Sequence, residues 1–328
     1  MKVWDYQMVS ALKGVCGDTT APVGALAHRF CHTMGLPDLA SGSGNGIGGF
    51  CLMSDAWGFD ETLDHPSQIS GWAKFKLGWL EARTPALGPN EIALAEEPSE
   101  QTQLYKIGDG KFGFPKDEYL LIEYRAQRGL DSGLPGEGLL IYHIDESPDV
   151  PNNVNEGHPW QEDDWPRNGK HYKVALVQAD RLYSLEWGIN NGGEKYFFSA
   201  EYVNALEPSE NSNALWEGPF PNTDSYQNGE VVETGVDIYR ISSPGEPSMS
   251  FSVRGHIESL KNKTFNAATT KEAETENMES SSEIDGNGNM GRDPPRKDRW
   301  KWNINSSIDI GTLRYPVGLS NAMLNHQP

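Results

Sequence analysis

Apolar positions between residues 21 and 34 recur with the spacing of one face of a helix, and polar residues lie between them. These positions are Val23, Leu26, Ala27, Phe30 and Met34. Thr19 and Thr20 suit a helix N-cap, and Pro22 suits a first helical turn. The pattern therefore predicts a helix over residues 21–34 that packs its apolar face into a core.

A second, shorter helical pattern follows, and strands dominate after it. Ser67 suits the N-cap of a helix that passes through Trp72 and ends at Gly78. From about residue 91, runs rich in β-branched and aromatic residues alternate with Gly, Pro and Asn turns, which is typical of strands. The four clearest runs are 118–124, 138–144, 173–178 and 249–253.

These elements predict an α+β protein in three parts. A cluster of Pro and Gly at residues 85–89 marks a boundary, so we expect one lobe over residues 1–88 and a β-rich domain over residues 89–255. Residues 256–328 combine Glu, Thr, Asn, Ser, Gly and Pro with few apolar positions. Such a segment buries too little apolar surface to offset the entropy of ordering it, which predicts a disordered tail.

The chain has 328 residues and a formal net charge of −20. Residues 256–328 hold nearly equal numbers of basic and acidic residues, so almost all of the excess acid lies in residues 1–255. An acidic body argues against nucleic acid and anionic membrane surfaces as partners. No apolar run reaches the length of a membrane span, and no signal peptide follows Met1. The sequence indicates no oligomeric state.

The strongest chemical signal is the pair His28 and His32 on the first predicted helix. At a spacing of four residues, two imidazoles share one helix face and can bind one Zn²⁺ through ring nitrogens. Gly35 allows a left-handed exit from the helix, Pro37 prevents its continuation, and Asp38 can return as a third ligand. This is the metzincin pattern H-E-x-x-H-x-x-G-x-x-H/D, except at its second position. For the histidine pair alone, a buried helix with core hydrogen bonds is the alternative.

A methionine turn is the second element of that pattern. Met53 follows a loop rich in Gly, Ser and Asn at residues 41–46, and metzincins place such a methionine beneath the zinc site. A methionine beside a leucine is otherwise typical of core packing. Met53 is therefore a candidate for either role.

Together these residues resemble the immune inhibitor A-like family of secreted zinc metallopeptidases. The resemblance covers residues 1–255 and implies that residues 1–88 are the lower lobe of a zincin-like catalytic domain. It also implies zinc as cofactor with His28, His32 and Asp38 as ligands, hydrolysis of peptide bonds in protein or peptide substrates, and export from the cell. The segments that carry the resemblance are 27–39, 52–54, 66–80, 136–145, 176–180 and 221–223.

The chain departs from this family in two places. Arg29 stands where these enzymes keep the glutamate that takes a proton from the metal-bound water. A guanidinium stays protonated and cannot act as this base, and its charge also weakens zinc binding by repulsion. Asp55 or Asp60 could replace the base only within hydrogen-bond reach of that water. The second departure is the short segment before the zinc helix, which leads us to expect a truncated chain without an upper lobe.

The polar loop that begins at Asp145 is a weaker candidate for a metal site. Asp145, Asp149, Asn152 and Asn155 offer oxygen ligands of the kind that Ca²⁺ prefers. No fixed calcium-binding spacing is present, so a solvated loop is the alternative.

The three cysteines are too few for a disulfide framework. Cys31 lies on the zinc helix and Cys51 beside the methionine turn, so the two are candidates for a disulfide in an exported form. Two buried free thiols are the alternative.

Three functions remain open. The first is a zinc metallopeptidase whose activity Arg29 impairs. The second is an inactive pseudoprotease that keeps the fold as a binding module. The third is an adhesive or carbohydrate-binding protein built on the β-rich half. Arg29 and the missing lobe favour the second over the first, and bound zinc without turnover distinguishes the second from the third.

Overall fold

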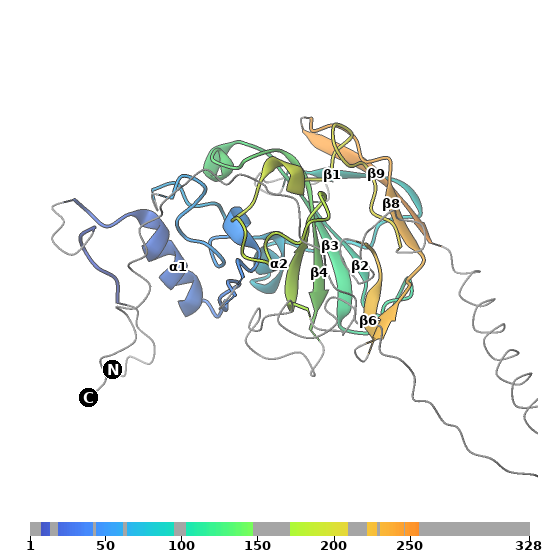
Figure 1. Cartoon of the computed structure of the whole chain (residues 1–328), viewed down its shortest axis with the longest axis horizontal. Coiled ribbons are helices and arrows are strands. Elements are labelled where there is room, and N and C mark those ends of the chain that lie inside the picture. Colours follow the sequence, from blue (N-terminus) through green and yellow to red (C-terminus); the bar gives the residue numbers. More distant parts are fainter. Residues whose placement is uncertain are drawn as a thin grey trace, which may run out of the picture. The chain divides into compact units, whose positions relative to one another are not determined.

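The computed structural model describes residues 8–13, 19–41, 44–61, 64–94, 103–146, 171–208, 222–227, 230–245 and 247–255. Within these ranges the protein is α+β, with few helices and several antiparallel sheets (Figure 1). The predicted tail at 256–328 lies outside the described residues. No helix in the described part of the chain is long and apolar enough to cross a membrane.

The α-helices are α1 (Val23–Thr33) and α2 (Gly71–Lys76), and the short 3₁₀ helices are η1 (Gly48–Phe50), η2 (Gly129–Asp131) and η4 (Glu194–Tyr196). The strands are β1 (Gly88–Ala93), β2 (Leu104–Gly108), β3 (Glu118–Arg125), β4 (Gly138–Asp145), β5 (Val174–Val177), β6 (Ser225–Gln227), β7 (Glu230–Val232), β8 (Val236–Tyr239) and β9 (Ser248–Gly255).

The sheet β2–β3–β4–β5 is antiparallel and organises the core. β3 and β4 are buried at every position because both faces of the sheet are covered, which explains their continuous apolar runs. Successive side chains point to opposite faces, so Leu120 and Ile122 join one hydrophobic cluster whereas Tyr119 and Leu121 join the other. The strands predicted at 118–124, 138–144 and 173–178 are confirmed as β3, β4 and β5.

A second antiparallel sheet, β1–β9–β8, packs against the first of these clusters. The strand predicted at 249–253 is confirmed as β9. Its partner β1 was not predicted, because Gly88 and Pro89 are typical of a domain boundary. These two residues instead form the start of β1. Proline is tolerated there because β1 is an edge strand.

The second cluster contains residues from both predicted parts of the chain. Leu39 and Trp72, from the predicted lobe 1–88, share it with Leu121 and Tyr142 of the central sheet. The helical segments that carry the candidate chemistry therefore rest directly on one face of β2–β5.

The outer side of α1 contradicts the predicted packing. Val23, Leu26 and Phe30 are 55%, 56% and 60% exposed, and we call these three residues the α1 stripe. Gly24 and Cys31 are the buried residues of this helix, and Ala27 is partly buried against the second cluster, so α1 docks through the side that carries these three residues. The apolar spacing found the helix and part of its packing face, since Ala27 and the following Met34 contact the second cluster. It also placed the α1 stripe in the core, because periodicity cannot say which neighbours are present.

The helix ends show which capping predictions were right. α1 begins after Pro22 and has no side-chain cap, so the cap predicted at Thr19 or Thr20 is wrong. Ser70 caps α2 by accepting a hydrogen bond from the Ala73 backbone N–H at 3.3 Å, in place of the predicted Ser67. The predicted exit at Gly78 is confirmed, since it adopts a φ of +71° directly after the helix.

A buried ionic network ties η1 and the segment before α2 to the central sheet. Arg125 on β3 donates two hydrogen bonds to Asp131 on η2 and a third to the Phe50 carbonyl oxygen at 3.0 Å. Asp131 also accepts a hydrogen bond from the Gln68 side-chain amide at 2.7 Å. Both Arg125 and Asp131 are almost fully buried, so the attraction between them acts where water screens it little.

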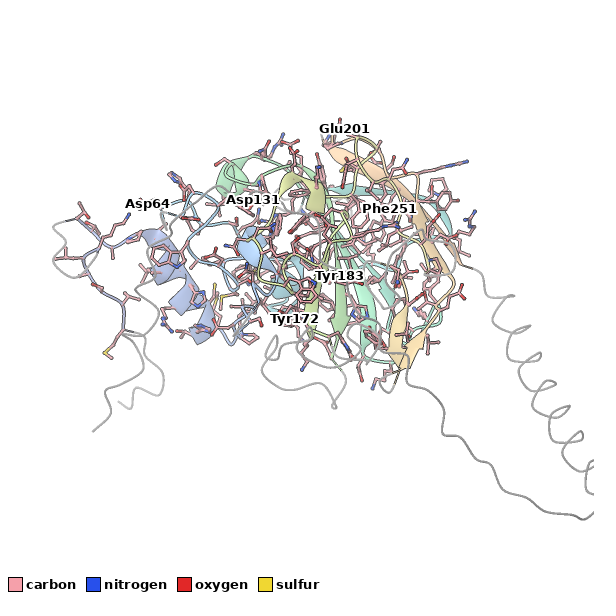
Figure 2. The ribbon with its side chains drawn as sticks, viewed as in Figure 1. Asp64, Asp131, Tyr172, Tyr183, Glu201 and Phe251 are labelled. Carbon is pink, nitrogen blue, oxygen red and sulfur yellow. The ribbon has the colours of Figure 1, made fainter. Side chains whose placement is uncertain are left out.

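Glu186 is a second buried ionisable side chain. The Gln178 side-chain amide donates to its Oε2 at 2.6 Å, whereas its Oε1 has no hydrogen-bond partner among the described residues. Burial raises the pKa of this carboxyl from 4.5 to about 7, and the charge of Asp180 adds to the effect. Burial and then the Glu186 charge raise the pKa of Tyr172, and burial, Tyr226 and then Glu186 raise the pKa of Tyr183. Both tyrosines are labelled in Figure 2.

We expect Glu186→Gln to stabilise the protein at pH 8 by about 3 kcal/mol and to leave it nearly unchanged at pH 4. Between pH 4.5 and about 7 the folded state holds the proton more tightly than the unfolded state does, so the stability of the unaltered protein falls as pH rises through this window. Urea unfolding at several pH values measures the effect. The exposed Glu194, changed to Gln, is the control. An identical pH slope for Glu186→Gln and the unaltered chain would contradict the prediction.

Candidate metal centre

The end of α1 determines how the candidate ligands meet. Gly35 has a φ of +95°, its N–H donates to the His32 carbonyl oxygen at 2.9 Å, and the Leu36 N–H donates to the Cys31 carbonyl oxygen at 3.2 Å. This is a Schellman motif, which glycine favours because it has no Cβ to clash. It reverses the chain, so that Asp38 returns toward the histidine face of α1, as the sequence predicted.

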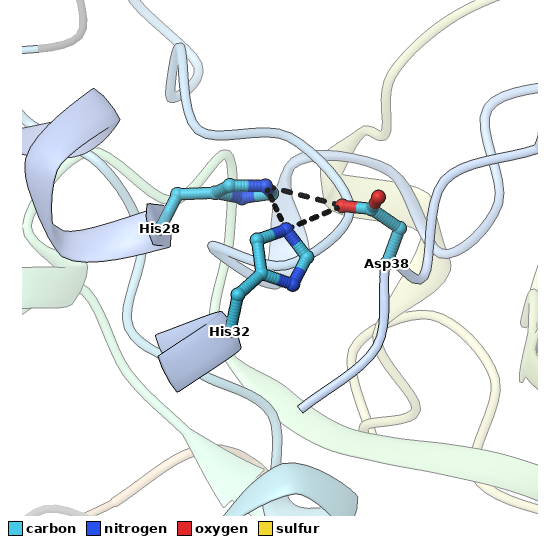
Figure 3. A group of neighbouring side chains, drawn as sticks. All are labelled: His28, His32 and Asp38. Carbon is cyan, nitrogen blue, oxygen red and sulfur yellow. Dashed lines mark hydrogen bonds and ion pairs between the residues drawn. The ribbon is translucent and has the colours of Figure 1, made fainter. Parts of the chain in front are cut away.

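The three predicted ligands point toward one another (Figure 3). The Nε2 atoms of His28 and His32 are 3.0 Å apart, and Asp38 Oδ1 lies 3.1 Å from the first and 3.3 Å from the second. Ligand atoms bound to one tetrahedral Zn²⁺ at about 2.0 Å lie about 3.3 Å from each other. The three atoms are therefore spaced almost as the ion requires.

Backbone contacts fix which nitrogen of each ring carries the hydrogen. His28 Nδ1 lies 2.9 Å from the Leu52 carbonyl oxygen, and His32 Nδ1 lies 2.9 Å from the Leu36 carbonyl oxygen. A carbonyl only accepts, so each Nδ1 must donate, and each neutral ring then presents a lone pair at Nε2. When both rings are neutral, two lone pairs and a carboxylate oxygen thus face the same point, where they repel one another unless a proton or a metal cation lies between them.

The charges of this site act on one another. When a proton occupies His28 Nε2, His28 donates a hydrogen bond to Asp38, and this bond raises the pKa of His28 against the opposing effects of burial and of the Arg29 charge. The same hydrogen bond lowers the pKa of Asp38, and Arg29 lowers it further. Arg29 itself is exposed on α1. Its charge therefore reaches both ligands although its side chain lies in solvent.

The site opens to solvent on one side. The side chains of His28 and His32 are 18% and 20% exposed, whereas that of Asp38 is 62% exposed. Three protein ligands with an open fourth position are typical of catalytic zinc sites, whereas structural zinc sites are closed by four protein ligands. The residues present therefore fit an accessible zinc ion.

The predicted methionine turn lies directly behind this site. Met53 is fully buried in the core, and its carbonyl oxygen accepts a hydrogen bond from the Leu39 N–H at 2.8 Å. Leu39 also contacts Gly46, where a Cβ would come within 1.9 Å of the Leu39 carbonyl oxygen. The turn thus holds both the Leu52 carbonyl behind His28 and the segment after Asp38. A specific role of the Met53 sulfur stays a prediction.

The other two candidate bases have partners of their own. Asp55 accepts hydrogen bonds from the Asn191 side chain and from the Trp57 N–H, and Asp60 pairs with His65 at 2.8 Å. Arg29 occupies the position where the resemblance would place the base.

Cys31 and Cys51 are free, buried thiols. Burial raises the pKa of both, and for Cys31 the neighbouring Cys51 raises it further. The disulfide that the sequence left open is not formed, and the alternative of free thiols is confirmed. Cys51 Sγ instead accepts a backbone hydrogen bond from Ser70 at 3.2 Å. Cys16 lies outside the described residues.

One of the four predicted calcium ligands lies among the described residues. Asp145 is buried at the end of β4 and lies 3.0 Å from His171 Nε2, measured from its Oδ2. Asp149, Asn152 and Asn155 lie outside the described residues. Among the residues that the structure does describe, His28, His32 and Asp38 form the single group of three or more His, Cys, Asp or Glu ligand atoms that converge.

Sequence reasoning found the three side chains but not the two backbone carbonyls that orient them. Leu36 and Leu52 contribute through backbone atoms, which any residue carries, so no side-chain motif marks them. Comparisons with known protein families, with curated proteins and with solved structures each found no match.

Proposed function

We propose that this protein is a zinc-binding, metallopeptidase-like protein that does not hydrolyse peptide bonds and acts as a binding module. One observation carries the proposal: two histidine lone pairs and one carboxylate oxygen face a common point at 3.0–3.3 Å from each other. The resemblance of residues 1–255 to secreted zinc metallopeptidases supports the choice of zinc. Export from the cell belongs to the same proposal because it rests on that resemblance.

Each residue of the site has a defined task. His28 and His32 hold the metal through Nε2, and the Leu52 and Leu36 carbonyls fix their tautomers. Asp38 supplies the third ligand and offsets one of the two metal charges. Zinc, when bound, would supply Lewis acidity and an acidic water. Hydrolysis also needs a base that accepts a proton, and Arg29 cannot do so because its guanidinium is already protonated at physiological pH.

Zinc content tests this proposal. We expect the unaltered chain to bind one equivalent of zinc per chain and His32→Ala to bind it at least about tenfold more weakly, since loss of a direct ligand should cost no less than loss of an outer partner. The matched control is His65→Ala, because His65 is exposed and pairs with Asp60 away from this site. Atomic absorption after dialysis and competition with a chelator measure both. Equal zinc retention by His32→Ala and His65→Ala would contradict the proposal.

The adhesive or carbohydrate-binding alternative has no specific support in the described residues. It stays a prediction from the composition of the β-rich half alone. A chain that binds no zinc but retains its fold would favour it.

A further inference from the structure

Arg29 separates the candidate metal site from the α1 stripe. Each residue of an α-helix turns by about 100°, so Arg29 lies about 60° around the axis from His32 and about 60° from Leu26 on its other side. His32 faces the site, and Leu26 is 56% exposed. A positive side chain therefore stands between the metal ligands and an apolar surface that faces solvent.

The charge at residue 29 determines the net charge of the zinc-loaded site, and therefore which ligands the site attracts. Both histidines are neutral when they bind metal through Nε2, so the negative charge of Asp38 and the positive charge of Arg29 cancel. A divalent zinc ion then leaves two net positive charges. A glutamate at residue 29 would leave none. Arg29 therefore makes the loaded site attractive to anions, in a chain whose formal net charge is −20.

We propose that the zinc-loaded site binds the C-terminal carboxylate of a peptide whose last side chain is apolar. This inference rests on the proposed function and names the ligand of the same site. The carboxylate contacts Arg29 beside the metal, and the apolar side chain lies on the α1 stripe. A guanidinium pairs with a carboxylate through two parallel hydrogen bonds, and a carboxylate oxygen is also an ordinary zinc ligand.

The apolar part of the ligand follows from the exposure of the stripe. Val23, Leu26 and Phe30 are each more than half exposed on consecutive turns of one helix. An inorganic anion would use Arg29 and the metal but would leave this apolar surface in water. A terminal Leu or Phe covers both features at once, because its side chain and its carboxylate branch from the same Cα.

Isothermal titration of the zinc-loaded protein tests this inference with three probes: N-acetyl-phenylalanine, its amide and acetate. We expect N-acetyl-phenylalanine to bind at least about tenfold more tightly than either of the others, because only it combines charge with apolar surface. Arg29→Gln should weaken it by at least about tenfold. Leu26→Ser should weaken N-acetyl-phenylalanine but not acetate. The control is Lys111→Gln, which removes an exposed charge from the β2–β3 connection.

Zinc content is measured on the same samples. A failure of the proposed zinc binding can then be distinguished from a failure of the proposed carboxylate binding. Equal affinity for the amide, unchanged affinity in Arg29→Gln or no effect of Leu26→Ser each contradicts the inference while zinc remains bound. Acetate that binds as tightly as N-acetyl-phenylalanine also contradicts it. An unaltered chain without zinc overturns the proposed function and, with it, this inference.

Discussion

Arg29→Glu is expected to convert the zinc-loaded protein into one that hydrolyses casein at least about 100 times faster than the unaltered chain. A positioned general base contributes about 10²–10⁴ in rate, and glutamate restores a group that can accept the proton. The change also replaces repulsion of the metal by attraction, so zinc affinity should rise by at least about tenfold. Release of acid-soluble peptides and zinc competition measure the two effects.

Arg29→Gln distinguishes the effect of removing the positive charge from the effect of adding a general base. Glutamine removes the positive charge without supplying a carboxylate, so it should share the gain in zinc affinity but not the gain in hydrolysis. Equal hydrolysis by the two variants would show that the charge, and not the missing base, limits the reaction. Turnover by the unaltered protein at the rate of Arg29→Glu would contradict the pseudoprotease proposal outright.

Asp131→Ala is expected to lower the free energy of unfolding by about 3–5 kcal/mol, the cost of leaving a buried charge without its main partner. Arg125 is fully buried, and two of its hydrogen bonds go to Asp131. Glu123 and the Phe50 carbonyl remain as partners of Arg125, at 3.3 Å and 3.0 Å. They compensate only partly, because the bidentate pair is lost. Urea unfolding followed by tryptophan fluorescence measures the change.

Asp64→Ala is the matched control. Asp64 is also labelled in Figure 2, but both it and its partner Lys13 are about half exposed, at 54% and 47%. Exposed pairs contribute about 0–1 kcal/mol, because water screens the charges. A cost below about 1 kcal/mol for Asp131→Ala would show that Glu123 and the Phe50 carbonyl are sufficient partners for Arg125. Weaker zinc binding should accompany a large cost, since the Arg125 network holds η1, which precedes the methionine turn.

The candidate site could be predicted from the sequence because it is local. His28, His32 and Asp38 lie within eleven consecutive residues, and helix geometry with one glycine turn determines how they meet. Contacts that come from segments far apart in the chain could not be predicted in this way. The Leu52 carbonyl becomes a partner of His28 only because the chain folds back after the loop at 44–50.

The strands were predicted where they are buried on both sides. β3 and β4 lie between two hydrophobic clusters, so their sequences are continuous apolar runs that any strand criterion detects. β1 escaped detection because it is an edge strand that opens with Gly88 and Pro89, and its pairing with β9 joins segments about 160 residues apart. Such pairing depends on the whole fold and leaves no local signal.

The sequence by itself determined the three candidate ligands, the turn that returns Asp38, the charge of Arg29 and the buried strands. Only the tertiary structure decided that the α1 stripe faces solvent, that Arg125 and Asp131 pair inside the core, and that Glu186 is buried. The reason is the same in each case. Helix spacing and turn residues act over a few positions, whereas burial and the partner of a charge depend on segments that meet only in the folded chain.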